Sequence, residues 1–123
     1  MAKLSERDLI RLATCDVKLQ MVGEKVAVQT DIMIVCGFRD ETAQNLAYDN
    51  GKSGLKWPDS KHNHYPALAF DIVPFQHGQA IDWEAIDQWR LMASYVWEVS
   101  LKFHVPLSWG GYFQDYSHFE IVK

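Results

Sequence analysis

The apolar residues in the first third of the chain predict a helix followed by a buried strand. Intervals of three or four residues, typical of one helical face, separate Ile10, Ala13, Val17 and Met21. Ser5 is placed to cap this helix, and the pattern fades near Gly23. Residues 31–36 then form a short apolar run before Gly37, and such a run is typical of a buried strand.

The middle of the chain predicts a second helix, a loop and a second strand. Residues 40–49 fit a short helix, and residues 51–58 indicate a loop because glycine, lysine, serine and proline dominate them. From Ala67 to Val73 the side chains should alternate between the two faces of a strand. One face takes Ala67, Ala69, Asp71 and Val73, and the other takes Leu68, Phe70 and Ile72. Pro74 limits this strand, because proline cannot donate a hydrogen bond to a neighbour.

The C-terminal part predicts a long helix and a last strand. Asp82 can cap a helix that runs to about Phe103, and Pro106 prevents its continuation. The apolar stripe of this helix consists of Ile86, Trp89, Ala93 and Trp97. Gly110 and Gly111 indicate a turn, and residues 117–122 a strand. Strands and helices without a regular βαβ rhythm indicate the α+β class.

Composition narrows the class of protein. The 123 residues correspond to one domain, residues 1–123, and 48% of them are hydrophobic, enough for one core. The net charge of −4, without a long run of either sign, argues against nucleic-acid binding and a polybasic membrane anchor. The N-terminus has no apolar stretch of the signal-peptide kind, so we expect no signal peptide. We expect Cys15 and Cys36, in apolar surroundings, to be buried reduced thiols.

Two histidine- and carboxylate-rich clusters indicate a metal site. His62 and His64 precede Asp71, and either pair requires a loop that folds back on the strand. A second cluster near the C-terminus contains Asp115 and His118. Two imidazoles and a carboxylate can fill three positions of a tetrahedral zinc site, with water in the fourth. We therefore interpret the clusters as halves of one site.

Asp115 is open to two interpretations, whereas two further histidines are assigned no role. Asp115 stands three residues before His118, where a carboxylate can serve as the base for an attacking water. Aspartate is also a common turn residue, and spacing alone favours that simpler interpretation. His77 and His104 have no acidic or histidine partner nearby in the sequence, so we assign them no role in the site.

Four stretches, in this order and at these separations, carry a resemblance to a known family. They are Gly37-Phe38-Arg39 followed by Gln44, then Gly51-Lys52-Ser53, then Ser60-Lys61-His62 through Ala69-Phe70-Asp71, and finally Trp109-Gly110-Gly111 through Asp115-Tyr116-Ser117-His118-Phe119-Glu120. From about residue 16 onward the chain resembles the M15 peptidases. These are the zinc D-Ala-D-Ala carboxypeptidases and L-alanyl-D-glutamate endopeptidases, which include phage endolysins.

The resemblance implies roles for individual residues. The expected zinc ligands are His62, Asp71 and His118, the expected catalytic residues are Asp115 as base and Arg39 as holder of the substrate carbonyl, and the expected substrate contacts are Gln44, Ser53 and Ser60. The serine-x-histidine signature favours His62 as the first ligand. Counting back from Asp71 at the usual family spacing selects His64, which remains the alternative.

The resemblance also implies a fold and a function. The fold expected is the small α+β zinc-peptidase fold of the Hedgehog and DD-peptidase type, a short antiparallel sheet with helices packed behind it. The activity expected is that of a monomeric phage endolysin that uses Zn²⁺ to cut the L-Ala–D-Glu bond of the peptidoglycan stem peptide. Such a protein is made in the host cytoplasm and reaches the wall after a holin opens the membrane. The alternatives are a D,D- or L,D-carboxypeptidase and a zinc-stabilised binding domain without turnover.

Overall fold

A four-stranded antiparallel sheet with the strand order β1-β2-β4-β3 organises the molecule. The computed structural model describes residues 4–76 and 78–122. Along the chain its elements are α1 (Glu6–Leu12), α2 (Val17–Gln29), β1 (Ile32–Cys36), α3 (Glu41–Asp49), the 3₁₀ helix η1 (Lys61–Asn63), β2 (Ala69–Pro74), α4 (Ile86–Phe103), β3 (Leu107–Trp109), the 3₁₀ helix η2 (Gly110–Phe113) and β4 (His118–Ile121). This arrangement confirms the predicted α+β class.

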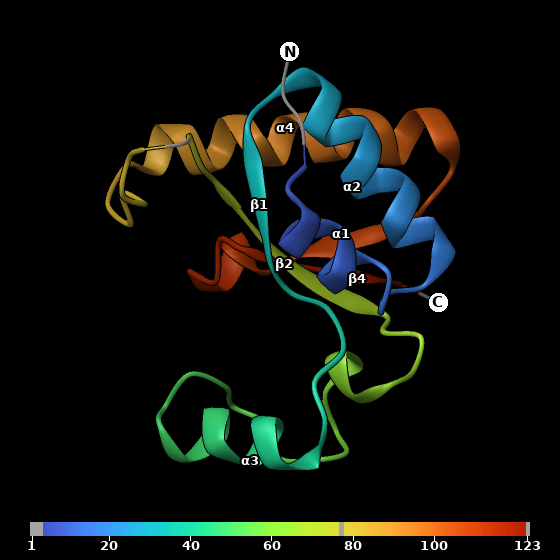
Figure 1. Ribbon diagram of the computed structural model, residues 1–123, viewed down its shortest axis with the longest axis vertical. Helices are drawn as coiled ribbons and strands as arrows, with labels where there is room; N and C mark the ends of the chain where they lie inside the picture. The colour runs from blue at the N-terminus through green and yellow to red at the C-terminus, as the bar shows by residue number, and fades with distance from the viewer. Residues whose placement is uncertain (1–3, 77, 123) are drawn as a thin grey trace.

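The core lies between the sheet and the helices α2 and α4, which pack on each other (Figure 1). Phe70 of β2 and Phe119 of β4 are fully buried, and their rings meet edge to face with centroids 6.4 Å apart. Trp89 of α4 is also buried in this core. Because β2 is the second strand from one edge and is covered on both faces, it forms a rigid support for whatever it carries.

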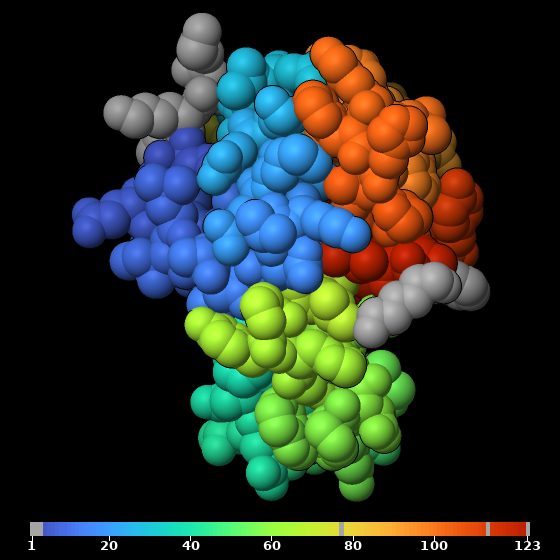
Figure 2. All heavy atoms as spheres, turned by 90° about the vertical axis from the view of Figure 1, so that its right-hand side faces the viewer, coloured from blue at the N-terminus to red at the C-terminus, as the bar shows by residue number. Residues whose placement is uncertain are grey.

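The segment of residues 40–60, which we call the α3 lobe, projects from the body of the molecule. Figure 1 shows α3 below the sheet, and Figure 2 shows the same segment as a narrower green lobe under the body. Asp40 caps α3 by accepting a hydrogen bond from the Ala43 amide at 2.8 Å. The lobe leaves the sheet after β1 and returns to it through η1, so it stands beside the ends of these elements.

The predicted first helix is wrong in its extent, because the chain forms two helices there. α1 ends at Leu12, and Asp16 starts α2 by accepting a hydrogen bond from the Lys18 amide at 2.9 Å. α2 continues through Gly23, which is buried in the packing between helices. A Cβ atom on Gly23 would lie 3.0 Å from Leu12, so this glycine allows a close approach and does not end the helix.

Three further boundaries differ from the prediction. Asp82 does not cap α4; its carboxylate accepts a hydrogen bond from the Glu84 amide, and the cap position is Ala85. Strand β2 begins at Ala69 and includes Pro74. The short strand β3 was not predicted, because three residues are too few to show an alternating pattern. The strand of residues 31–36, the helix of residues 40–49 and the loop of residues 51–58 are confirmed within a residue or two.

Candidate active site

The sheet register brings three chemically active side chains into one row. Asp71 of β2 lies opposite Cys36 of β1 on one side and His118 of β4 on the other. The register of β1 shifts between Ile34 and Cys36, and this irregularity sets Cys36 opposite Asp71. Side chains of directly paired residues on neighbouring strands lie within contact distance, so the row forms one site.

The histidine of η1 completes a cluster of three ligand atoms. The Nε2 atom of His62 lies 3.3 Å from Nδ1 of His118 and 3.5 Å from Oδ1 of Asp71, and the last two atoms are 3.2 Å apart. Ligands that bind zinc tetrahedrally at about 2.0–2.1 Å are separated from one another by about 3.3–3.4 Å. The spacing and the chemistry of these donors therefore fit a zinc ion.

Hydrogen bonds at the far ring nitrogens orient both imidazoles. Nδ1 of His62 lies 2.8 Å from the Gly37 carbonyl, to which it donates. Nε2 of His118 donates to the Glu120 carboxylate at 2.8 Å, and Lys61 pairs with the same carboxylate at 3.1 Å. In the neutral form of each ring, these two bonds select the tautomer in which Nε2 of His62 and Nδ1 of His118 can bind a metal.

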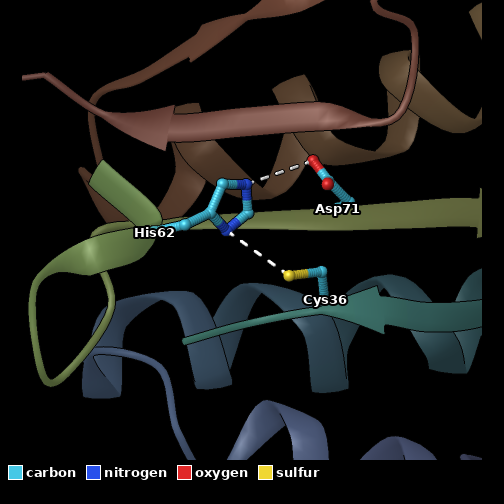
Figure 3. A group of neighbouring side chains, drawn as sticks. All are labelled: Cys36, His62 and Asp71. Atoms are coloured by element: carbon cyan, nitrogen blue, oxygen red, sulfur yellow. Dashed lines mark hydrogen bonds and ion pairs between the residues drawn. The ribbon is translucent and has the colours of Figure 1, made fainter. Parts of the chain in front are cut away.

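Cys36 offers a thiol on the other side of the His62 ring. Figure 3 shows the ring between Asp71 and Cys36, with its two nitrogens directed at different partners. The Cys36 sulfur lies 3.8 Å from Nδ1 of His62, and one ligand atom from each of these three residues falls within 4.8 Å of the others. They form a potential metal-binding group. Nδ1 of His62 is already bonded to the Gly37 carbonyl, so the set that contains His118 is the better formed of the two.

Protonation in the absence of metal follows from these contacts. Burial opposes a charge on His62, but the hydrogen bonds and charges of Asp71 and Cys36 outweigh it and raise the pKa of His62 to about 10. Burial likewise opposes charge on Asp71, yet His118 and His62 hold the pKa of that carboxyl well below its usual range. The metal-free site therefore binds protons on its imidazoles, which a metal ion would displace.

Arg39 and Asp115 reach the site from two other segments. The Arg39 guanidinium lies 3.6 Å from the Asp71 carboxylate and 3.7 Å from the Cys36 sulfur. A cleft of about 560 Å³ opens over these side chains. Arg39 lines it, and so does Asp115, which lies in the turn before β4. Burial of its carboxyl and the nearby Asp71 charge raise the pKa of Asp115. A raised pKa suits a group that must both take up and return a proton.

A close approach of the chain at Gly110 places Asp115 beside His118. A Cβ atom on Gly110 would lie 2.5 Å from the Asp115 carbonyl oxygen and 3.1 Å from Cβ of His118. The Asp115 amide donates to the Gly110 carbonyl at 2.9 Å. Only glycine fits this turn, which explains the glycine in the Trp109-Gly110-Gly111 stretch.

Comparison with known families shows where this site belongs. The profile of the phage L-alanyl-D-glutamate peptidases matches residues 1–121. The chain belongs to this family. It is therefore a peptidase, as the four sequence stretches implied, and its family acts on the L-alanyl-D-glutamate bond of peptidoglycan. Comparison with curated protein sequences gave no match.

A solved structure shares the fold of this phage peptidase. The crystal structure of Serratia marcescens L-Ala D-Glu endopeptidase ChiX superposes with a TM-score of 0.79. The match covers 98% of this chain and 91% of that chain, at 20% sequence identity. The predicted small peptidase fold is confirmed by this likeness.

The expected substrate contacts of the peptidase lie in different environments. Gln44 is fully buried, and its amide bonds to Arg39, Ser53 and Asn63 leave it no access to the cleft. Ser60 is 5% exposed, and its hydroxyl accepts a hydrogen bond from the His62 amide. Ser53 lines the cleft and is half-buried. Gln44 and Ser60 thus position Arg39 and His62. Ser53 and Ser60 both line the cleft, and Ser53 is the more exposed of the two.

The two other histidines among the described residues take no part in the cluster. His64 is exposed and follows η1 as its C-terminal cap, while the cluster contains His62. His104 is exposed at the end of α4 and adopts the left-handed conformation there. His77 lies outside the described residues.

Sequence reasoning missed two residues at the peptidase site. Cys36 was expected to be an inert buried thiol; it is half-buried and contacts both His62 and Arg39. Cys15 does fit that expectation, because burial raises the pKa of its thiol to about 12. Glu120, the partner of His118, lies two residues further along the same strand. That alternation was a signal, since residues two apart share one face of a strand.

Proposed function

We propose that this phage peptidase is zinc-dependent and hydrolyses the L-Ala–D-Glu bond of the stem peptide. The observation that carries the proposal is the convergence of His62 Nε2, Asp71 Oδ1 and His118 Nδ1 within 3.5 Å of one another. The bonds from the opposite ring nitrogens to the Gly37 carbonyl and to Glu120 support it, since they select the tautomers that a metal needs. In this proposal these three residues hold the zinc.

The metal would supply one part of the chemistry. When bound, zinc polarises a carbonyl and lowers the pKa of a water molecule to about 7, which makes a hydroxide-like nucleophile accessible at neutral pH. Asp115 would take the proton of the attacking water and return it to the amine that leaves. Its place in the cleft three residues before His118 supports this role, as does its raised pKa.

Arg39 would hold the carbonyl oxygen of the scissile bond while negative charge develops on it. Arginine keeps its proton at any working pH and presents a fixed fork of donors. Donors that are already oriented stabilise a developing charge most effectively. Arg39 is oriented in this way, because Gln44 accepts a hydrogen bond from it at 3.1 Å and its own amide donates to the His62 carbonyl at 2.8 Å.

The same proposal covers partners and location. The substrate is peptidoglycan, cut by a single-domain monomer that reaches the wall after a holin opens the host membrane. Among the described residues, no helix is both long and apolar enough to cross a membrane. The family profile favours the endopeptidase over a carboxypeptidase, and a carboxypeptidase would release D-alanine from intact stem peptides.

A matched pair of histidine variants tests the metal site. His62→Ala should lose bound zinc and all peptidase activity, whereas His64→Ala should keep both, because His64 is exposed outside the cluster. Metal analysis of the purified proteins and mass spectrometry of digested muropeptides give the two readouts. Loss of zinc and activity in the His64 variant alone would overturn the proposed ligand set.

A further inference from the structure

A second hollow, of about 330 Å³, adjoins the cleft on the side of Asp115. Asp115 and Ser117 line both the hollow and the cleft, so the two are adjacent. The other walls of the hollow include Trp83 and Tyr116. The proposed hydrolysis assigns no role to this hollow, although the proposed base Asp115 is one of its lining residues.

Trp83 presents an open aromatic face at this hollow. Of the five tryptophans, all among the described residues, Trp83 alone is exposed, with 62% of its surface accessible. One face of its indole stacks on Trp89, with ring centroids 5.3 Å apart and planes at 25°. Trp89 is buried and donates a hydrogen bond to the Asp82 carbonyl at 3.1 Å. The buried ring thus supports the exposed one, which keeps most of its surface accessible.

The charges around the hollow and the cleft differ. Among the described residues no lysine or arginine lines the hollow, whereas Lys52, Arg39 and Lys61 line the cleft. Arg39 and Lys61 are paired with Asp71 and Glu120. The Lys52 ammonium, on the α3 lobe, has no ion-pair partner among the described residues. The free cation therefore stands at the cleft wall of the lobe, and the aromatic hollow, which Asp115 borders, is lined by no cation among the described residues.

The stem peptide has a matching asymmetry. The L-Ala residue is joined through a lactyl group to the neutral ring of a muramoyl sugar, while the D-Glu residue carries a free α-carboxylate and the stem ends in a further carboxylate. We propose that the hollow binds this muramoyl sugar ring against Trp83, with the acidic part of the stem directed towards the α3 lobe. The inference rests on the proposed peptidoglycan substrate and adds the direction in which it lies.

The short distance along the substrate between the sugar ring and the scissile bond agrees with a sugar site next to the proposed base. One residue spans at most about 3.3–3.6 Å, so a single alanyl and a lactyl unit bring the sugar close to the scissile bond. The hollow has the proposed base as one of its lining residues, so it adjoins the place where the scissile bond would lie. Amphipathic aromatic surfaces with a few polar groups are typical of ligand pockets. Gln114 and Tyr116 supply such groups at the hollow.

The test compares two substrates that differ only in the sugar ring. One is the N-acetylmuramoyl tetrapeptide, and the other is the same tetrapeptide carrying a D-lactoyl group without the sugar. The wild-type enzyme should cut the sugar-bearing substrate with a kcat/KM roughly 2- to 10-fold higher, the range expected from an aromatic stacking contact. Equal kcat/KM values for the two would overturn the inference and leave the proposed function intact. Cleavage of neither would overturn the proposed function.

Two variants of Trp83 then test whether the preference for the sugar-bearing substrate depends on this residue. Trp83→Ala should remove the preference for the sugar and leave kcat/KM on the D-lactoyl peptide unchanged, and Trp83→Phe should keep part of it. Leu101→Ala, which truncates an exposed apolar side chain near the other end of α4, is the matched control and should keep the full preference. An equal loss on both substrates would show a general structural effect and overturn the inference. If Trp83→Ala fails to fold, the Phe variant gives the same decision.

Discussion

Single residues orient the imidazole rings of the candidate metal site before any metal binds. Gly37 and Glu120 each accept a hydrogen bond from one imidazole, and each bond leaves the opposite nitrogen directed at Asp71. A Cβ atom on Gly37 would collide with Thr14 and with the Arg11 carbonyl, so the chain can pass here only as glycine. The orientation of the His62 ring therefore depends on a residue that has no side chain.

Asp115 is the residue whose proposed role can be separated most cleanly from metal binding. It lines the cleft, whereas the three ligand atoms belong to His62, Asp71 and His118. Asp115→Asn should keep zinc and the fold and lose at least about 10²-fold in turnover, since general acid–base groups typically contribute about 10²–10⁴-fold. Zinc content, thermal melting and muropeptide turnover should be measured on the same preparation.

The simpler role of Asp115, as a turn residue, predicts a different outcome. Asparagine is also a good turn residue, and it keeps the backbone bonds to Gly110 and His118. Near-wild-type turnover of Asp115→Asn would therefore show that the carboxylate only shapes the turn. Loss of zinc together with activity would place Asp115 among the metal ligands and contradict its role as base.

At the scale of elements, Gln44 joins the α3 lobe to the site. Its side-chain oxygen accepts hydrogen bonds from Arg39 at 3.1 Å and from Asn63 at 3.0 Å. Its side-chain nitrogen donates to Ser53 and to the Leu55 carbonyl. One buried amide therefore links the helix, the cleft-lining loop and the arginine.

Truncation of this amide should weaken both stability and catalysis. Gln44→Ala leaves the Arg39 guanidinium without its Gln44 acceptor, and each buried group left unpaired costs about 1–3 kcal/mol. We expect a lower melting temperature and a decrease of kcat/KM by at least about 10-fold, which corresponds to roughly 1.4 kcal/mol or more, with zinc content unchanged.

Asn45→Ala is the matched control for Gln44→Ala. Asn45 is the next residue of α3, and it accepts a hydrogen bond from the Trp57 amide at 3.1 Å without contacting Arg39. This variant should lower the melting temperature and leave kcat/KM near the wild-type value. If both variants reduce kcat/KM equally, the lobe as a whole matters and Gln44 has no special role in placing Arg39.

The elements also show which parts of the fold and the site could be predicted from the sequence alone. The apolar run of β1 and the long stripe of α4 are strong periodic signals, and both elements were predicted. Residue types and motif order selected His62 over His64, and the structure places His62 in the cluster. The position of Cys36 opposite Asp71 depends on a register shift in β1 that no local pattern shows. Contacts between residues far apart in the sequence, such as those of Gln44, likewise could not be predicted from the hydrophobic pattern.

At the scale of the whole molecule, net charge and substrate charge oppose each other. The protein carries −4, and the stem peptide beyond L-Ala is acidic, so their long-range interaction is repulsive. Local cations must offset this repulsion at the cleft. Arg39 and Lys61 already have carboxylate partners, which leaves Lys52 as the lysine available to a new anion among those that line the cleft.

Lys52 should therefore recognise a carboxylate of the substrate, and the free α-carboxylate of D-Glu stands next to the scissile bond. Lys52→Gln should lower kcat/KM on stem peptides with this free carboxylate by about 3- to 10-fold, which corresponds to about 0.7–1.4 kcal/mol. Stem peptides in which the carboxylate is amidated should be cut by the variant and the wild type at similar rates, because amidation removes the charge. Steady-state kinetics on the two substrates give the measurement.

Lys56→Gln separates this contact from general steering by positive charge. Lys56 is in the same lobe and also exposed, but its ammonium lies 4.9 Å over the Tyr48 ring and it does not line the cleft. Loss of either lysine changes the net charge equally, so a long-range effect would reduce activity in both variants and on both substrates. A contact requires that only Lys52→Gln respond, and only on the substrate with the free carboxylate. If amidation makes no difference to Lys52→Gln, the α-carboxylate lies elsewhere, and the direction of the stem peptide inferred from the charges of the cleft is wrong.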